Sequence, residues 1–217
     1  MIEIIQKGPI SFDAKIIHDY YHDTNLDFTI ILDTPCQLKF QNLSFTLDFK
    51  SSSYQRLIAD HHTLLLAIGK QKSHVLDAFG GLGKDGFILA HAGHKVKSCE
   101  INPILYLILS QAVENYGLDN WEICYGDVLD LLTPYDVIYI DPMFEIQRSA
   151  KPKLAMQVIQ QVTLDQTFKA WTTLYQNCNK RLVVKQHTRS PIIIGLPKPS
   201  MQIKGKCNVR YDIYLKS

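Results

Sequence analysis

The chain has 217 residues, of which 46% are hydrophobic and 20% are charged, and its formal net charge at neutral pH is +2. This composition excludes a disordered chain, a collagen-like fibre and a coiled coil, and the length fits one ordinary domain with a smaller appendage. The apolar runs are far shorter than the roughly 20 residues of a membrane-spanning helix, and no secretory leader follows Met1, so we expect a cytoplasmic protein without a membrane partner.

Five cysteines are spread along the chain without any Cys-x-x-Cys pair. An odd number at irregular spacing is typical of reduced thiols in a cytoplasmic protein rather than of a disulfide framework or a zinc site. The histidines also lack metal-ligand spacing. We therefore expect no metal.

The first part of the chain, residues 1–53, holds short runs in which apolar and polar residues alternate, among them 2–5, 28–32 and 43–49. A period of two is typical of strands with one buried face, so we predict a small β-rich N-terminal unit. Residues 54–68 change to helical spacing and end at Gly69, which predicts one connecting helix.

From residue 74 onward, short apolar runs rich in β-branched and aromatic residues alternate with helical segments. Strands are expected over 75–79, 96–100, 121–125, 135–140 and 181–185, and helices over 86–92, 103–116 and about 153–177. This alternation predicts an α/β fold with a Rossmann-like, doubly wound, mostly parallel sheet. The runs 201–204 and 210–215 are close enough to end it in an antiparallel hairpin. We place the unit boundary between residues 53 and 54, which gives units 1–53 and 54–217.

Charge is divided unevenly along the sequence. Residues 1–141 hold 10 Lys and Arg against 18 Asp and Glu, whereas residues 142–217 hold 13 against 3. Because phosphate contacts supply most of the sequence-independent affinity for nucleic acid, the basic last third favours a polyanionic partner.

The segment Asp77-Ala78-Phe79-Gly80-Gly81-Leu82-Gly83 ends the first parallel strand and opens a helix. Its glycines allow a sharp turn and a close approach to a ligand, and the helix N-terminus offers free N–H groups. We expect a small anionic or zwitterionic ligand at Asp77, Gly81 and Gly83. The spacing Gly81-x-Gly83-x-x-Gly86 also fits the dinucleotide pattern, so a nicotinamide cofactor stays an alternative.

Two acidic positions follow the next strands at the same predicted edge. Glu100 ends the second strand, where a carboxylate accepts hydrogen bonds from the hydroxyls of a ribose. Gly126-Asp127 follows the third strand, where Asp127 either receives the amine of an adenine or caps the helix that follows.

The sequence Asp141-Pro142-Met143-Phe144 follows the fourth strand. Asp141 and a nearby carbonyl accept hydrogen bonds from a planar amine and take up its proton as the nitrogen attacks a sulfonium methyl, while Phe144 covers the flat face of a base. An Asp-Pro turn with no catalytic role is the simpler interpretation of this motif alone.

The glycine loop together with Asp141-Pro142-Met143-Phe144 resembles the S-adenosylmethionine-dependent amino-methyltransferases, whose fourth-strand motif is usually Asp/Asn-Pro-Pro-Phe/Tyr. Met143 replaces the second proline. With the basic residues of 148–151, Val-Val-Lys at 183–185 and Arg-Tyr-Asp-Ile-Tyr at 210–214, the chain resembles the RsmJ family of bacterial small-subunit ribosomal RNA guanine 2-amino methyltransferases. The resemblance covers residues 74–217, and residues 1–60 match loosely.

The resemblance implies a class I methyltransferase domain over 54–217, S-adenosylmethionine as the cofactor, and cofactor contacts at Lys84, Asp85, Glu100, Ile101, Gly126, Asp127 and Asp141. Lys84 stands where arginine is common, which keeps the charge and loses the planar fork. The resemblance also implies that Asp141, Pro142 and Phe144 are the catalytic residues.

Basic residues after the fourth and fifth strands are expected to project from the carboxyl edge of the sheet. We assign them to RNA phosphates and to positioning the guanine; they are Arg148, Lys151, Lys153, Lys185, His187 and Arg189.

The sequence thus predicts an enzyme that methylates the exocyclic 2-amino group of a guanosine in 16S ribosomal RNA, acting on the RNA or on the ribosomal subunit. Three alternatives stay open. They are an NAD-dependent oxidoreductase, a non-catalytic RNA-binding module, and a methyltransferase that acts on an adenine 6-amino group or a glutamine amide.

Overall fold

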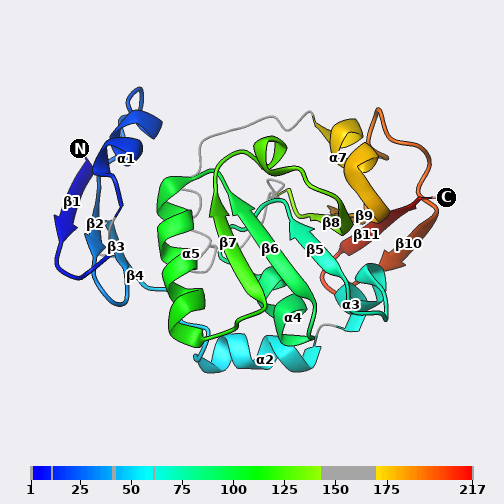
Figure 1. Ribbon diagram of the computed structural model, residues 1–217, viewed down its shortest axis with the longest axis horizontal. Coiled ribbons are helices and arrows are strands. Elements are labelled where there is room, and N and C mark those ends of the chain that lie inside the picture. Colours follow the sequence, from blue (N-terminus) through cyan, green and yellow to red (C-terminus); the bar gives the residue numbers. More distant parts are fainter. Residues whose placement is uncertain (1, 11, 41–42, 61, 143–169, 217) are drawn as a thin grey trace.

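The N-terminal unit is a small sheet with one helix beside it, shown in blue in Figure 1. The computed structural model describes residues 2–10, 12–40, 43–60, 62–142 and 170–216. Its first strands and helix are β1 (Ile2–Gln6), α1 (Ala14–Tyr20), β2 (Phe28–Leu32), β3 (Gln37–Phe40) and β4 (Leu43–Phe45). The sheet has the order β1-β2-β3-β4, and only β1 and β2 pair in parallel. The β-rich N-terminal unit is therefore confirmed, with α1 as the connection that a parallel pair requires.

Residues 54–68 are predicted as one connecting helix. The structure has α2 (Ser52–Asp60) and α3 (His62–Ile68) here, and residue 61 between them lies outside the described residues. The two helices pack against different partners, because α2 contacts α4 whereas α3 contacts the last strands of the main sheet.

The main sheet has seven strands in the order β10-β11-β9-β8-β5-β6-β7. They are β5 (His74–Asp77), β6 (Lys95–Glu100), β7 (Trp121–Tyr125), β8 (Tyr135–Ile140), β9 (Cys178–His187), β10 (Met201–Lys204) and β11 (Val209–Leu215). Strands β5 to β9 pair in parallel, and β9-β11-β10 pair antiparallel. The predicted α/β fold, a doubly wound and mostly parallel sheet that ends in an antiparallel hairpin, is confirmed.

Helices cover the sheet between these strands: α4 (Lys84–His91), α5 (Pro103–Tyr116), the 3-10 turn η1 (Val128–Leu131) and α7 (Trp171–Asn177). Helix α5 matches its predicted range, and α4 begins two residues earlier than predicted. The part of the predicted helix over 153–169 lies outside the described residues. Within the described chain, no helix is long and apolar enough to cross a membrane.

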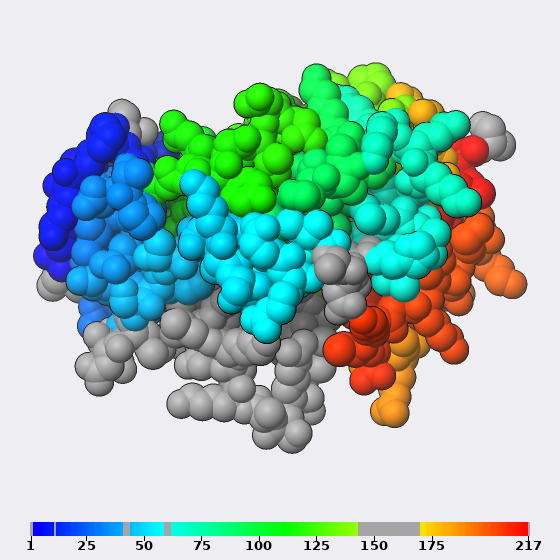
Figure 2. Space-filling model, turned by 90° about the horizontal axis from the view of Figure 1, so that it is seen from below, coloured from blue at the N-terminus to red at the C-terminus, as the bar shows by residue number. Residues whose placement is uncertain are grey.

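The strand order reverses at β5, because β6 follows on one side and β8 lies on the other. This reversal opens a crevice at the carboxyl ends of the strands in doubly wound folds. One hydrophobic cluster fills the face of the sheet that carries α4 and α5 and extends into the N-terminal unit, and a second fills the face that carries α7. Figure 2 shows the N-terminal unit in blue at one end of the molecule and the last strands in orange and red at the other.

Candidate functional site

Four of the predicted site residues lie on one face of the main sheet. Side chains alternate along a strand, and Val75, Val96, Val137 and Val183 all belong to the core on the α4 and α5 face. Asp77, Glu100, Asp141 and Lys185 are an even number of residues further along the same strands, or just past their ends. The fold thus brings together side chains that are up to 108 residues apart in the sequence.

Glu100 is fixed in place by backbone N–H groups from two different loops. The Gly81 N–H donates to Oε2 at 2.7 Å, and the Asn102 N–H donates to Oε1 at 2.8 Å. Burial raises the pKa of Glu100, and the backbone donors at Asn102, Gly81 and Ile101 oppose that rise. Each carboxylate oxygen has two acceptor positions, so Glu100 keeps capacity for ligand hydroxyls.

The glycines at the carboxyl edge, in the loop after β5 and at the end of β7, have two different functions. Gly81 has φ +52° and Gly126 has φ +136°, and a Cβ added at either would meet no atom of the described residues within 4 Å. Gly83 has φ +65°, but a Cβ there would lie 2.4 Å from the Leu109 side chain. The Gly83 N–H also donates to the Gly80 carbonyl. Among the described residues, Gly81 and Gly126 therefore border space beside Glu100 that no side chain fills, whereas Gly83 permits close packing and a ligand contact there stays a prediction.

Asp77 is buried at the end of β5 and accepts a hydrogen bond from the Ser98 hydroxyl at 2.8 Å. Trp121 Nε1 donates to the same hydroxyl at 2.9 Å, which fixes its direction. Burial raises the pKa of Asp77 well above its ordinary value, and the charges of Asp85 and Asp141 add to this effect. Asp77 therefore lies within electrostatic range of the predicted catalytic carboxylate.

Lys185 joins two carboxylates that come from separate elements. Its Nζ lies 2.7 Å from Asp141 Oδ2, just past β8, and 2.7 Å from Asp85 Oδ2, in the first turn of α4. The Tyr139 hydroxyl also donates to Asp85 Oδ2, at 2.6 Å. This cluster of Asp85, Tyr139, Asp141 and Lys185 is called the carboxylate–lysine cluster below.

The carboxylate–lysine cluster sets the protonation of Asp141. Burial raises the pKa of Asp141 to about 6, Lys185 opposes the rise, and Asp85 adds to it. The pKa of Lys185 is raised by Asp85 and Asp141 in spite of its burial, so its ammonium stays charged. With both acids ionised the cluster has one net negative charge, which suits it to accept hydrogen bonds and a proton.

Asp127 caps the turn that follows β7. Its side chain accepts the N–H of Leu129 at 2.9 Å, which is the capping alternative of the sequence analysis. Its contact with an adenine stays a prediction. Lys84 is exposed at the first position of α4, and Ile101 and Pro142 are half-buried beside the site.

The predicted RNA-contacting residues divide into two groups. Lys185 is engaged by the two carboxylates, His187 is half-buried, and Arg189 is exposed. Arg148, Lys151 and Lys153, like Phe144, lie outside the described residues. The RNA contacts stay predictions, and Lys185 has a second assignment within the carboxylate–lysine cluster.

Sequence reasoning missed three residues that shape the site: Ser98, Asn102 and Tyr139. Asn102 could have been found from the sequence, because it precedes Pro103 at the start of α5, where a helix cap is expected, and its side chain caps that helix. Ser98 and Tyr139 gave no such signal, because they lie inside strands.

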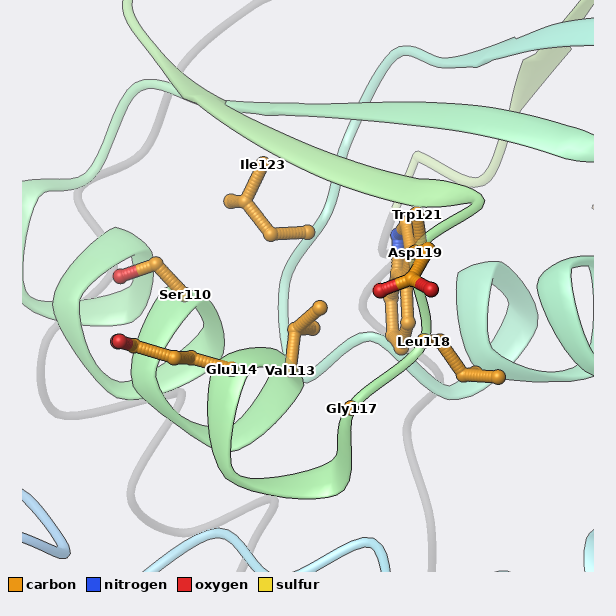
Figure 3. A pocket seen from close by; sticks show the side chains of 8 residues that line it. All are labelled: Ser110, Val113, Glu114, Gly117, Leu118, Asp119, Trp121 and Ile123. Atoms are coloured by element: carbon orange, nitrogen blue, oxygen red, sulfur yellow. The ribbon is translucent and has the colours of Figure 1, made fainter.

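Other described parts of the chain offer fewer groups that could react with a ligand or bind one. No group of side chains that could hold a metal occurs within the described part of the chain, and all five cysteines are free. A shallow surface cavity of about 330 Å³ lies between α5 and β7, where the side chains of Val113, Trp121 and Ile123 border it (Figure 3). Its described lining includes none of the predicted site residues.

Comparisons with known proteins agree with this geometry. A family model described as "Putative SAM-dependent methyltransferase" matches residues 44–216. The chain is 34% identical over 172 residues to the ribosomal RNA small subunit methyltransferase J of Pseudomonas aeruginosa, a match that covers 69% of this chain and 64% of that protein. It is 30% identical over 200 residues to the protein of the same name from Francisella tularensis subsp. novicida, covering 82% and 83%.

A solved structure of a SAM-dependent methyltransferase from Neisseria gonorrhoeae has the same fold. It superposes with a TM-score of 0.64 at 20% identity, and the match covers 98% of this chain and 95% of that one.

Proposed function

The chain belongs to the RsmJ family of S-adenosylmethionine-dependent methyltransferases, and we propose that it methylates the exocyclic 2-amino group of a guanosine in 16S ribosomal RNA. The observation that carries this proposal is the position of Asp141. It lies at the same edge of the sheet as Gly81 and Glu100, with a raised pKa and a fixed partner in Lys185.

The residues at the carboxyl edge fit S-adenosylmethionine. Glu100 presents a fixed, buried carboxylate to the two hydroxyls of a ribose, and Gly81 and Gly126 leave room beside it for the nucleoside. The exposed Lys84 and the N-terminus of α4 lie at the end of the same loop, where they suit the carboxylate of the methionine part. When bound, the cofactor supplies an electrophilic methyl group on a sulfonium.

Asp141 acts on the amine of the base. The lone pair of an exocyclic amine is delocalised into the ring, so the nitrogen is a weak nucleophile until its hydrogens are held by acceptors. The Asp141 carboxylate accepts one N–H and takes the proton that the nitrogen loses on forming its new bond to carbon. A pKa near 6 suits this task, because the group is ionised at neutral pH and still basic enough to receive a proton.

Lys185 and Asp85 orient Asp141. The ammonium of Lys185 donates to Oδ2 of Asp141, which fixes the plane of the carboxylate. Asp85 holds the other side of the ammonium, and Tyr139 holds Asp85. Holding reacting groups in line supplies a large part of enzymatic rate enhancement, about 7 to 11 kcal/mol in favourable cases.

The basic last third of the chain binds the RNA in this proposal, with Arg189 exposed two residues beyond β9. This distribution of charge favours the proposal over the oxidoreductase alternative, because an oxidoreductase gives the basic region no function. The family match favours S-adenosylmethionine over a nicotinamide cofactor.

The experiment is methyl transfer with radiolabelled S-adenosylmethionine to small ribosomal subunits from a strain that lacks this protein. We expect label in a single guanosine, identified as the 2-amino-methylated nucleoside by mass spectrometry. Label in an adenine or in a ribosomal protein would replace the guanine assignment. Binding of subunits without transfer would support the non-catalytic module.

A further inference from the structure

The N-terminal unit contacts both strand ends that flank the proposed cofactor site. Tyr21, at the end of α1, is buried and exchanges hydrogen bonds with the Asn102 side chain: Asn102 Nδ2 lies 2.8 Å from the Tyr21 hydroxyl, which lies 3.1 Å from Asn102 Oδ1. Asn102 follows Glu100 by two residues. The docking point is therefore adjacent to the predicted ribose acceptor.

Asn102 forms hydrogen bonds with several other residues. Its N–H donates to Glu100 Oε1, its Oδ1 accepts the N–H groups of Ile104 and Leu105, and its amide meets Tyr21. The side chain thus caps α5, and the backbone of the same residue holds the Glu100 carboxylate. Any displacement of the Asn102 backbone that follows the loss of the Tyr21 contact moves the N–H donor on which Glu100 depends.

A second contact reaches the end of β7. The ring of Phe12 lies edge-on to Tyr125 with centroids 5.9 Å apart, and Tyr125 immediately precedes Gly126. The ring of Tyr20 lies edge-on to that of Tyr21 with centroids 4.8 Å apart. The pKa of Tyr20 is raised to about 12 by burial and by the nearby Glu100 and Tyr125, while a hydrogen bond with Asn102 opposes the rise. Aromatic residues of the unit therefore contact Asn102, two residues after Glu100, and Tyr125, at the end of β7.

We propose that the N-terminal unit is part of the cofactor site, with Tyr21 as a positioning residue that orients Glu100 through Asn102. This inference rests on the proposed function, since it takes Glu100 as the acceptor of the ribose hydroxyls. Linkage makes the effect reciprocal: if docking of the unit strengthens cofactor binding, the bound cofactor strengthens docking by the same factor.

The test measures the affinity of the full chain for S-adenosylhomocysteine and for its 2′-deoxy analogue by calorimetry. We expect the wild type to prefer the ribose form by about tenfold, the size of a hydrogen bond to a charged group. Tyr21→Phe keeps the ring packed on Phe28 and removes the hydroxyl. We expect it to bind S-adenosylhomocysteine several-fold more weakly, with the preference for the ribose form largely lost.

Tyr214→Phe is the matched control. Tyr214 is a fully buried tyrosine on β11, and its hydroxyl has no hydrogen-bond partner among the described residues. We expect this variant to keep the wild-type ratio of the two affinities. A purely structural role for Tyr21 would weaken both ligands equally, and an unchanged ratio in Tyr21→Phe overturns the inference.

Limited proteolysis of the wild type gives a second measurement that does not depend on any variant. Residues 48–51 join the N-terminal unit to α2, and S-adenosylhomocysteine should slow cleavage there several-fold, while NADH should not. Equal cleavage with and without saturating S-adenosylhomocysteine overturns the inference. If the wild type binds neither ligand, the proposed function falls and the inference falls with it; if it binds and Tyr21→Phe keeps the ratio, only the inference falls.

Discussion

The Lys185 ammonium lies 2.7 Å from the Asp141 carboxylate, although the two residues are 44 positions apart, with Asp141 just past β8 and Lys185 on the adjacent parallel strand β9. The pair is half-buried at the carboxyl edge of the sheet and shares its ammonium with Asp85. A buried cation between two acids costs desolvation, which the two short contacts offset. Such a cluster fixes the orientation of its members more than it stabilises the fold, so its function is best tested through activity.

Asp141→Ala should abolish methyl transfer and spare the fold. The variant loses the acceptor for the amine proton, and general acid–base groups contribute about 100- to 10,000-fold to rates. Lys185 keeps Asp85 as its partner, so no unpaired charge is left buried. Methyl transfer and thermal unfolding measure the two effects, and near-normal turnover would remove Asp141 from the mechanism.

The rate should depend on pH through Asp141. Only the carboxylate accepts the amine proton, and burial places its pKa at about 6 against the opposing charge of Lys185. We expect kcat/KM to be level above neutrality and to fall about tenfold per pH unit below 6. A profile without a limb between pH 5 and 7 would contradict this assignment.

Lys185→Met should move that limb to higher pH. Without the ammonium, Asp85 and Asp141 face each other as like charges in a buried site, and the pKa of Asp141 rises further. At neutral pH the variant should be slower than the wild type and should recover part of its rate at higher pH. Lys185→Arg keeps the charge and should keep the limb near its wild-type position. If Lys185→Met lowers the affinity for RNA and leaves the pH profile unchanged, Lys185 contacts RNA phosphates and does not set the pKa of Asp141.

The sheet was readable from the sequence because parallel strands buried on both faces consist of short β-branched and aromatic runs. Residues 121–125, 135–140 and 201–204 match their strands exactly at both ends. Glu100 and Asp141 were found for the same reason, since a polar residue at the end of such a run falls at the ligand edge.

Other features lacked a local signal. Helix α1 has seven residues, too few to show helical periodicity, although Asp13 caps it. The partners of Lys185 come from α4 and from the end of β8, so its pairing depends on tertiary contacts that no spacing in the sequence reports. The docking of Tyr21 on Asn102 is likewise a contact across 81 residues.

Arg189→Ala should weaken RNA binding without changing the affinity for S-adenosylhomocysteine. Arg189 is exposed beyond β9, and a phosphate contact contributes roughly one unit to the slope of log affinity against log salt concentration. Filter binding of a 16S RNA fragment across a salt series measures the slope. Arg56→Ala, on α2, is the matched control and should leave the slope unchanged.

Gly81→Ala and Gly86→Ala should separate ligand binding from packing. An alanine at Gly81 meets no atom of the described part of the chain but requires a left-handed backbone, which costs about 1 kcal/mol. An alanine at Gly86 places its methyl 2.7 Å from the Trp121 ring and 2.9 Å from the Ser98 hydroxyl, an overpacking that costs about 1 to 3 kcal/mol.

We therefore expect Gly86→Ala to be the less stable of the two in thermal unfolding. Gly81→Ala should lose more affinity for S-adenosylhomocysteine, because its methyl projects into the space beside Glu100 where the ligand is proposed to lie. Calorimetry on both variants at a temperature where each is folded decides the matter. Wild-type affinity in Gly81→Ala would show that the open space at this glycine is not where the cofactor binds.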